Sequence, residues 1–334
     1  MNEKKILLAH GSGGRMSQEL LKELLPELAN PILDRLDDAA VFEASGRLAF
    51  TTDSYTVQPL FFPGGDIGRL AVCGTVNDLA MSGAVPKYLS LAFIIEEGLP
   101  LEDLRRVVTS IRDAAAEAGV NIVTGDTKVV NQGSADGLFV NTAGIGIVPE
   151  GIDISAANAR PGDSVIMSGS LGDHGIAVMS QREGLTFSTP VPSDCAPLNG
   201  LVAAMLAVRP ELRCLRDPTR GGLVTTLNDF AAQSGAGLRI EETALPVKPA
   251  VRAACELLGL EPLAIANEGK LAAVVPPERA ADVLAVMRQH RYGKDAAIIG
   301  RVTSEHPGRV VMTTMLGASR IIDVPAGELL PRIC

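Results

Sequence analysis

The sequence has 334 residues, a length typical of two domains, and its 46% hydrophobic residues can supply a sizeable core. Its 39 acidic residues outnumber the 30 basic ones, and the net charge of −9 argues against general attraction to nucleic acid or to an anionic membrane. No apolar run approaches a membrane span of about 20 residues, and the five cysteines form no Cys-x-x-Cys pair. We therefore expect a cytoplasmic protein with reduced thiols, which binds no nucleic acid and no membrane.

Strands and helices alternate through the first part of the chain. Apolar residues at helical spacing favour helices, and shorter apolar runs bounded by turn residues favour strands. The expected strands are 48–57, 86–96, 120–124 and 138–148, and the expected helices are 67–82 and 100–119. Pro100 starts the second helix and Gly119 ends it. Residues 1–150 are therefore predicted to form an N-terminal α/β domain.

A second α/β series follows the turn-forming residues 149–151. Its expected strands are 164–168, 237–241 and 270–275, its expected helices are near 174–183, 195–208, 221–233, 249–258 and 277–290, and strands and turns continue from about 297 to 324. Residues 151–326 are predicted to form a C-terminal domain, and residues 327–334 a flexible tail. Fully extended, the residues after Gly327 reach roughly 23 Å, enough to cross a cleft.

The chain ends on a cysteine, Cys334, which is followed only by the terminal carboxylate. Chain ends are usually mobile, and a thiol is a nucleophile that can hold a covalently attached group. Cys334 is therefore placed to carry such a group into and out of a pocket. The alternative is a tail cysteine without a role.

Acidic residues gather at predicted turns of the first domain. Magnesium takes carboxylate oxygens and bridges to phosphates, and ligands collect at the strand ends of α/β sheets. The candidate metal ligands are Asp38, Asp53, Asp78 and Asp126. Together these positions predict a metal–nucleotide site, although each acid taken alone is more often a solvated loop residue or a helix cap.

Three further segments offer groups for phosphate chemistry. Gly11, Ser12, Gly13 and Gly14 form a flexible run whose bare amides can wrap phosphate oxygens, although such runs are often linkers and no Walker A sequence follows. Lys128 can place a point charge on an anionic intermediate, or it is a surface lysine. Gly221 and Gly222, at the start of the helix expected near 221–233, form either an anion site or an ordinary helix cap.

Two residues of the second half are candidates for proton transfer. Glu268 precedes a predicted strand and is next to Gly269, so it can act as a general base or be a simple turn acid. His174 follows a Gly-Asp turn, where a single histidine is more often structural than catalytic.

Together these segments resemble the superfamily of ATP-dependent enzymes that includes aminoimidazole ribonucleotide synthetase, selenophosphate synthetase and thiamine-monophosphate kinase. The segments that carry the resemblance are Asp37–Ala40, Thr52–Asp53, Val76–Ala84, Thr124–Thr127, Ser168–Gly172 and Asp217–Leu223, in order along the chain. The resemblance implies a two-domain α/β (α+β) fold, and a homodimer in which each N-terminal sheet joins its partner's in a barrel. It also implies ATP and Mg²⁺ in the cleft, with Asn77 and Thr127 among the nucleotide contacts.

Within that superfamily, the His10–Gly14 run, the Asp217–Gly222 segment and the terminal Pro331–Cys334 are similar to a family of hydrogenase maturation proteins, the carbamoyl dehydratases. This similarity implies that a HypF carbamoyltransferase loads a carbamoyl group onto Cys334, and that ATP-dependent dehydration converts it to a thiocyanate. The cyanide would then pass to iron held by a HypC–HypD complex, for the nickel–iron hydrogenase centre. Cys334 would be the covalent carrier, with Glu268 and Lys128 in catalytic roles.

Two other functions remain open on the sequence. The first is another ATP-dependent enzyme of the same superfamily, a small-molecule kinase or synthetase. A selenophosphate-type synthetase is disfavoured, because residues 1–72 contain no cysteine. The second is a nucleotide-bound scaffold for maturation partners, which would not hydrolyse ATP in step with a modification at Cys334.

Overall fold

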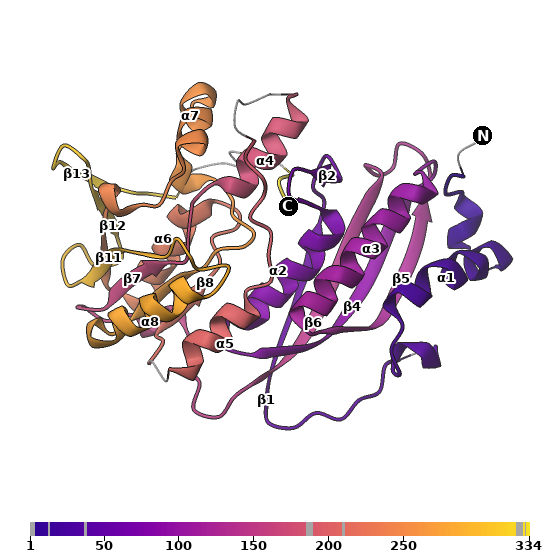
Figure 1. Ribbon diagram of the computed structural model, residues 1–334, viewed down its shortest axis with the longest axis horizontal. Helices are drawn as coiled ribbons and strands as arrows, with labels where there is room; N and C mark the ends of the chain where they lie inside the picture. The colour runs from indigo at the N-terminus through magenta and orange to yellow at the C-terminus, as the bar shows by residue number, and fades with distance from the viewer. Residues whose placement is uncertain are drawn as a thin grey trace.

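The computed structural model describes residues 4–12, 14–36, 39–184, 190–208, 211–324, 330 and 332–334. Two sheet-based units lie side by side, with the C-terminus between them and the N-terminus at the outer edge of the first unit (Figure 1). Within this described part, no helix is long and apolar enough to cross a membrane.

The N-terminal unit is a four-stranded sheet in the order β1-β6-β4-β5. Its strands are β1 (Arg47–Tyr55), β4 (Val85–Glu96), β5 (Asn121–Val130) and β6 (Leu138–Val148). The β4–β5 pair is parallel and the other pairs are antiparallel. Helices α2 (Ile67–Met81) and α3 (Leu101–Ala118) cover one face of this sheet (Figure 1).

The other face of the same sheet carries exposed apolar side chains. Side chains alternate between the two faces along a strand, so each strand has one buried set and one outward set. Leu91 and Phe93 of β4 are buried in the core with α2 and α3, whereas Ile94 points away from the helices. Phe50 of β1 lies on that same outward face and is 70% exposed.

Helix α3 shows how local sequence sets its ends. Glu102 and Asp103 stand in its first turn, where acidic groups favour the helix dipole, and Gly119 ends it in the left-handed conformation at φ 70°. Its apolar stripe is fully buried against the sheet and α2. The helix predicted from Pro100 to Gly119 is confirmed.

The C-terminal unit is a seven-stranded sheet in the order β13-β12-β9-β11-β7-β10-β8. Its strands are β7 (Ser164–Met167), β8 (Cys214–Arg216), β9 (Gly237–Glu241), β10 (Ala272–Val275), β11 (Ala297–Thr303), β12 (Val310–Thr313) and β13 (Ser319–Ile321). Its helices are α4 (Asp173–Arg182), α5 (Asn199–Ala207), α6 (Gly222–Ser234), α7 (Pro249–Leu258) and α8 (Pro277–Gln289). Separate apolar clusters pack on its two faces, one with α6 and the other with α5 and α8.

Short elements complete the described chain. They are the helix α1 (Arg15–Leu28), the strands β2 (Phe61–Phe62) and β3 (Gly65–Asp66), and the 3₁₀ helices at Leu8–Gly11, Leu33–Arg35, Ala156–Asn158, Glu242–Ala244 and Pro262–Ala264. One apolar cluster includes residues from both units, from Leu70 of α2 to Ile176 of α4 and Ile333 of the tail. The two units therefore share packing around the C-terminus.

Several sequence expectations need correction. The strand predicted to end at 124 continues to Val130, because β4 runs beside it as far as Glu96 and pairs with its whole length. The helix predicted from 195 begins at Asn199, because residues 193–198 form a loop bound to α2 and to the Glu268 segment. Helix α1 and strand β8 were not predicted.

Candidate active site between the two domains

The end of the chain is docked between the two units. The backbone N–H and the hydroxyl of Thr56 donate to an oxygen of the Cys334 terminal carboxylate at 3.2 and 3.3 Å, and the N–H of Gln58 donates to the Arg332 carbonyl at 3.3 Å. Ile333 is buried, and Cys334 is half-buried against the apolar cluster that joins the units. The described end of the predicted flexible tail is therefore held inward, beside the segment that follows β1.

Arg332 fixes this end through both its backbone and its side chain. It adopts the left-handed conformation at φ 53°, which is uncommon for a residue with a Cβ. Its guanidinium donates to the Thr56 carbonyl at 3.2 and 3.0 Å and pairs with Asp136. Such a conformation persists only where surrounding contacts over-determine it, so the docked tail is specifically held.

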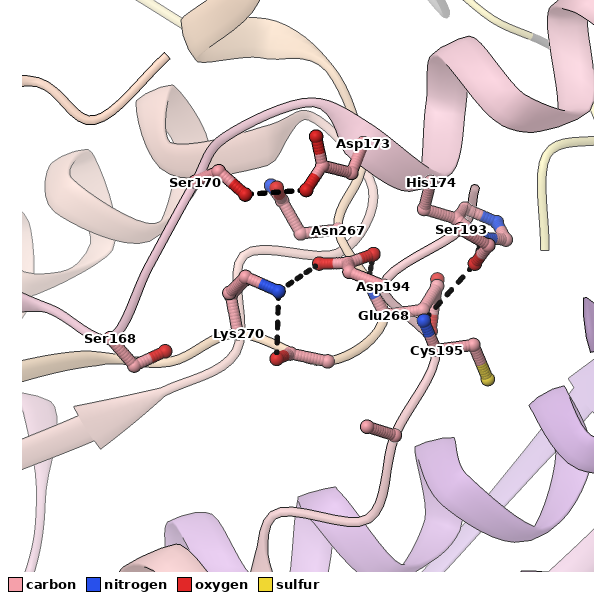
Figure 2. Close-up of polar contacts among 12 residues, drawn as sticks. Ser168, Ser170, Asp173, His174, Ser193, Asp194, Cys195, Asn267, Glu268 and Lys270 are labelled. Carbon is pink, nitrogen blue, oxygen red and sulfur yellow. Dashed lines mark hydrogen bonds and ion pairs between the residues drawn. The ribbon is translucent and has the colours of Figure 1, made fainter. Parts of the chain in front are cut away.

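Glu268 lies in the loop between the last 3₁₀ helix and β10 and is 2% exposed. Its N–H donates to Asp194 Oδ1 at 3.1 Å, and Lys270 holds the other oxygen of Asp194 at 3.2 Å (Figure 2). A Cβ at Gly269 would lie 1.8 Å from the Asp194 carbonyl, so only glycine permits this approach. Glu268 Oε1 is buried with no hydrogen-bond partner among the described residues.

Electrostatics make Glu268 a stronger base than an ordinary carboxylate. Burial, followed by repulsion from Asp217, Asp194 and Asp53, raises the pKa of Glu268 well above its usual range. Burial and repulsion from Asp78 raise the pKa of Asp217 to about 7. Both carboxyls therefore hold protons more tightly than solvated acids do.

Asp217 is placed beside Glu268 by a glycine-dependent turn. The amide of Asn267 donates to the Pro218 carbonyl at 3.1 Å, which ties the two loops together. Gly222 has φ 59°, and a Cβ there would lie 2.4 Å from the Leu263 carbonyl. The sequence singled out the Asp217–Gly222 segment as an anion site or cap, but it did not indicate Asp217 itself as a site residue.

Asp53 and Asp78 belong to the same acidic neighbourhood, although neither lies in a turn as the sequence suggested. Asp53 is inside β1, and Asp78 is inside α2, where its Oδ2 accepts from the Thr51 hydroxyl at 2.9 Å. Burial raises the pKa of Asp78, and Asp53 adds to that rise by repulsion. In the described part of the chain, no three or more His, Cys, Asp or Glu side chains lie close enough together to hold a metal ion by themselves.

Asn77 is engaged by the C-terminal unit. Its amide donates to the carbonyls of Ala196 and Glu268 at 3.1 and 3.4 Å, and its oxygen accepts from the Leu198 N–H at 2.7 Å. It therefore braces the Glu268 loop against α2 from a fully buried position.

Asp126, Thr127 and Lys128 lie apart from this neighbourhood. All three belong to β5, and Lys128 Nζ binds both oxygens of Asp126 at 2.8 and 2.7 Å, with the lysine side chain 63% exposed. In the β4–β5 register Lys128 lies beside Ile94, which is on the outward face, so the Lys128 side chain also points away from α2 and α3. Asp53 and Asp126 stand three strand spacings apart in the order β1-β6-β4-β5, or roughly 14 Å. Within one chain the structure does not bring Lys128 to Glu268, nor Asp126 to Asp53.

The glycine run lies at the β5 edge of the sheet. A Cβ at Gly11 would come within 2.6 Å of the Val129 N–H nitrogen, so glycine is needed for this contact. Gly11, Ser12, Asp126, Thr127 and Lys128 line one cavity of about 740 Å³. Gly14 precedes α1 as its N-cap. The predicted site residues Gly13 and Asp38 lie outside the described residues.

Comparisons with known proteins agree with this architecture. Residues 36–148 match the family described as AIR synthase related protein, N-terminal domain, and residues 160–313 match the C-terminal domain of the same family. A carbamoyl dehydratase HypE of Azotobacter vinelandii is 56% identical over 329 residues, which cover 98% of this chain and 96% of the relative. The HypE of Escherichia coli K12 is 51% identical, with 98% and 99% covered. The chain belongs to the HypE family of carbamoyl dehydratases.

Solved structures place the HypE family among hydrogenase maturation proteins. A crystal structure of the hydrogenase maturation protein HypE in complex with ATP superposes with a TM-score of 0.96 at 52% identity, covering 98% of this chain and 99% of that one. A HypE–HypF complex matches with a TM-score of 0.82 at 51% identity, covering 93% and 100%. A thiamine-monophosphate kinase of Stenotrophomonas maltophilia is 19% identical with a TM-score of 0.65, covers 97% of this chain and 100% of that one, and shares the fold. The predicted family, two-part fold and enzyme class are confirmed.

Proposed function

We propose that this chain uses ATP to convert a carbamoyl group on the Cys334 thiol into a thiocyanate, which supplies cyanide for the iron of nickel–iron hydrogenases. One observation carries the proposal: the docked C-terminus binds Thr56, and the preceding residue, the buried Tyr55, lies within electrostatic reach of the buried Glu268. An oxygen of the Cys334 carboxylate accepts from the Thr56 N–H, and the Tyr55 hydroxyl has its pKa raised by burial first and then by nearby acids that include Asp53 and Glu268.

The reaction moves one phosphoryl group and two protons. The carbamoyl oxygen attacks the γ-phosphorus of ATP and ADP leaves, so the oxygen becomes part of a phosphate leaving group. A base takes one proton from nitrogen to give an imidate. Loss of the second proton then breaks the C–O bond, forms the C≡N bond and releases phosphate. The site must therefore bind phosphates and accept protons from nitrogen.

Glu268 suits the proton-accepting role. Its unpartnered Oε1 can accept a hydrogen bond from the carbamoyl nitrogen, and its raised pKa favours taking the proton. Gly269, which has no side chain, leaves room for the Glu268 loop to approach its neighbours. Asp194 and Asn77 hold that loop in place through its backbone.

The residues present fit a magnesium ion. Asp53, Asp78 and Asp217 repel one another, and Asp38 is a further candidate from the sequence. Magnesium is usually held by one or two carboxylates together with substrate phosphates, so it does not need a preformed cage. When bound, it would supply positive charge to the phosphates of ATP. Asp126 is too far from Asp53 to share this ion in one chain.

A homodimer would account for the residues on the outward face of the N-terminal sheet. Phe50 and Ile94 leave an exposed apolar surface there, and a partner's sheet could cover it to form the expected barrel. Asp126 and Lys128 lie on that face, so they would contribute to a nucleotide site only at the subunit interface. A HypF carbamoyltransferase would load Cys334, and a HypC–HypD complex would accept the cyanide.

Mass spectrometry of the C-terminal peptide tests the proposal. The full-length protein is first incubated with a HypF carbamoyl-donor system. In a second step, ATP is either supplied or withheld. We expect a carbamoyl adduct on Cys334 that becomes a thiocyanate only with ATP. Cys334→Ala should keep its fold and ATP binding but accept neither group. A thiocyanate that forms without ATP, or a carbamoyl adduct on Cys334→Ala, would contradict the proposal.

A further inference from the structure

We propose that helix α4 forms a two-point latch on the docked C-terminal tail, in which His174 is the positioning residue that aligns the Cys334-bearing peptide with Glu268. This inference rests on the proposed function for its catalytic consequence, although the latch itself can be tested without any reaction. His174 and Arg182 stand at the two ends of α4, and each contacts a different carbonyl of the tail.

The first contact comes from the imidazole of His174. Its Nε2 lies 2.8 Å from the Ile333 carbonyl oxygen, and a carbonyl can only accept, so Nε2 carries the hydrogen. Its Nδ1 lies 2.9 Å from the hydroxyl of Ser193, which donates to it. Ser193 Oγ in turn accepts from the Cys195 N–H at 3.1 Å. Each group in this chain has one fixed role, and the chain selects the Nε2–H tautomer.

The surroundings of His174 keep the ring neutral and in place. The side chain is fully buried, and the ring of Phe62 meets it edge to face with centroids 5.3 Å apart. Burial lowers the pKa of His174 below its ordinary value, although Asp194 opposes that shift. A neutral ring with a bare Nδ1 is the form that the two hydrogen bonds require.

The second contact comes from Arg182, eight residues further along α4. Its Nη2 donates to the Arg332 carbonyl at 2.7 Å and to the Gln58 carbonyl at 2.7 Å. The guanidinium therefore joins the tail to the segment beside it. The two latch contacts use successive backbone carbonyls, those of Arg332 and Ile333, and so they hold the peptide that leads directly into Cys334.

The loop that supports His174 also supports Glu268. Ser193 binds the imidazole, and the neighbouring Asp194 accepts from the Glu268 N–H at 3.1 Å (Figure 2). Ser193 is itself fixed by its N–H, which donates to the Pro63 carbonyl at 2.7 Å. One short turn thus sets the position of the tail anchor and of the proposed base relative to each other. This connection distinguishes His174 from a residue that only stabilises the core.

The latch acts at one stage of the cycle. A transferase must reach the thiol from outside, so loading requires a released tail, whereas dehydration requires the docked one. Loss of the His174 contact should therefore shift the tail toward release, and slow thiocyanate formation without impairing carbamoylation. Losing one hydrogen bond to the carbonyl should change the docked fraction by about five- to tenfold.

Two matched variants separate the hydrogen bond from the shape of the side chain. His174→Phe keeps a ring but removes the donor, while His174→Gln places an amide N–H near the position of Nε2. The first readout is the rate at which iodoacetamide alkylates Cys334, measured on the C-terminal peptide of the full-length protein without ATP. We expect His174→Phe to react about five- to tenfold faster than wild type and His174→Gln to react close to the wild-type rate. Equal rates in folded wild type and His174→Phe would overturn the latch.

A third variant, at Arg182, guards against the case in which His174→Phe does not fold, a defect that melting temperature and alkylation of the four internal cysteines would reveal. Arg182→Met removes the other contact and should also accelerate alkylation of Cys334. If His174→Phe does not fold, Arg182→Met alone decides, and a wild-type rate there overturns the latch.

The catalytic consequence is measured separately, on protein already carrying the carbamoyl group. With saturating ATP, His174→Phe should form thiocyanate about five- to tenfold more slowly with an unchanged KM for ATP, and His174→Gln should restore the rate. Faster alkylation with an unchanged thiocyanate rate would overturn the positioning role. If wild type forms no thiocyanate at all, the proposed function fails, whereas the alkylation comparison still tests the latch.

Discussion

The two faces of the N-terminal sheet carry the same kinds of residue in opposite environments. On the face covered by α2, burial and repulsion raise the pKa of Asp78, and in the adjoining loops they raise those of Asp217 and Glu268. On the outward face, the neighbouring Lys128 lowers the pKa of Asp126, and both side chains are mostly exposed. An aspartate facing α2 therefore binds its proton more tightly than usual, whereas an aspartate on the outward face forms a simple ion pair. The sequence alone does not show which face an aspartate occupies.

The largest expected effect comes from the covered face. Asp53→Asn and Asp78→Asn should each weaken Mg·ATP binding or turnover by on the order of a hundredfold, because an amide supplies neither charge nor a carboxylate ligand. Isothermal titration with Mg·ATP and a coupled ADP assay measure this, with melting temperature as the control for folding. Unchanged binding and turnover in both variants would show that the covered acids are not the nucleotide site.

A backbone change should disturb the same face without altering any charge. Gly269→Ala would place a methyl group 1.8 Å from the Asp194 carbonyl, so the Glu268 loop must shift. We expect a loss of several kcal/mol in the free energy of unfolding, as for other severe overpacking, together with lost dehydration. Gly200→Ala is the control, because its Cβ would make only an ordinary contact at 3.4 Å inside α5. Equal denaturant midpoints for the two variants would contradict the close approach.

The raised pKa of Asp217 predicts a pH dependence of stability. Its folded pKa of about 7 lies above the ordinary value near 4, so the folded protein binds the extra proton between these values. The contribution of Asp217 to the stability of the metal-free protein should therefore be complete below about pH 4. This contribution should be lost as the pH rises to about 7. Asp217→Asn should flatten that loss in urea titrations across the range. A slope identical to wild type would mean that Asp217 titrates normally.

The smallest effect is expected on the outward face. Lys128→Ala breaks an exposed ion pair, which should change the free energy of unfolding by less than about 1 kcal/mol. Its effect on ATP turnover should appear only in the dimer, because Lys128 cannot reach Glu268 within one chain. Mixing Lys128→Ala with Glu268→Gln subunits checks this: activity recovered in mixed dimers supports a shared site. Full activity of Lys128→Ala homodimers would remove Lys128 from the mechanism.

Sequence reasoning identified the family and both sheet-based units, because those depend on local periodicity and on contiguous motifs, and it singled out Glu268 as a candidate base. It placed Asp126 in a turn, because Gly125 looks like the end of a strand, whereas pairing with β4 carries β5 to Val130. It did not find the contacts that Asp194, Arg182 and His174 make. These contacts join segments far apart in the chain, as does the bond from His174 to Ile333, and no local pattern encodes them.

Glu268→Gln tests most directly whether Glu268 is the base, because glutamine keeps the size and hydrogen-bonding capacity of the side chain but cannot accept a proton. The variant is loaded with the carbamoyl group, given ATP and followed by mass spectrometry of the C-terminal peptide. We expect the carbamoyl adduct on Cys334 to persist, with the rate of thiocyanate formation at least about a hundredfold below wild type and ATP binding retained. Thiocyanate forming at the wild-type rate would contradict the assignment of Glu268 as the base.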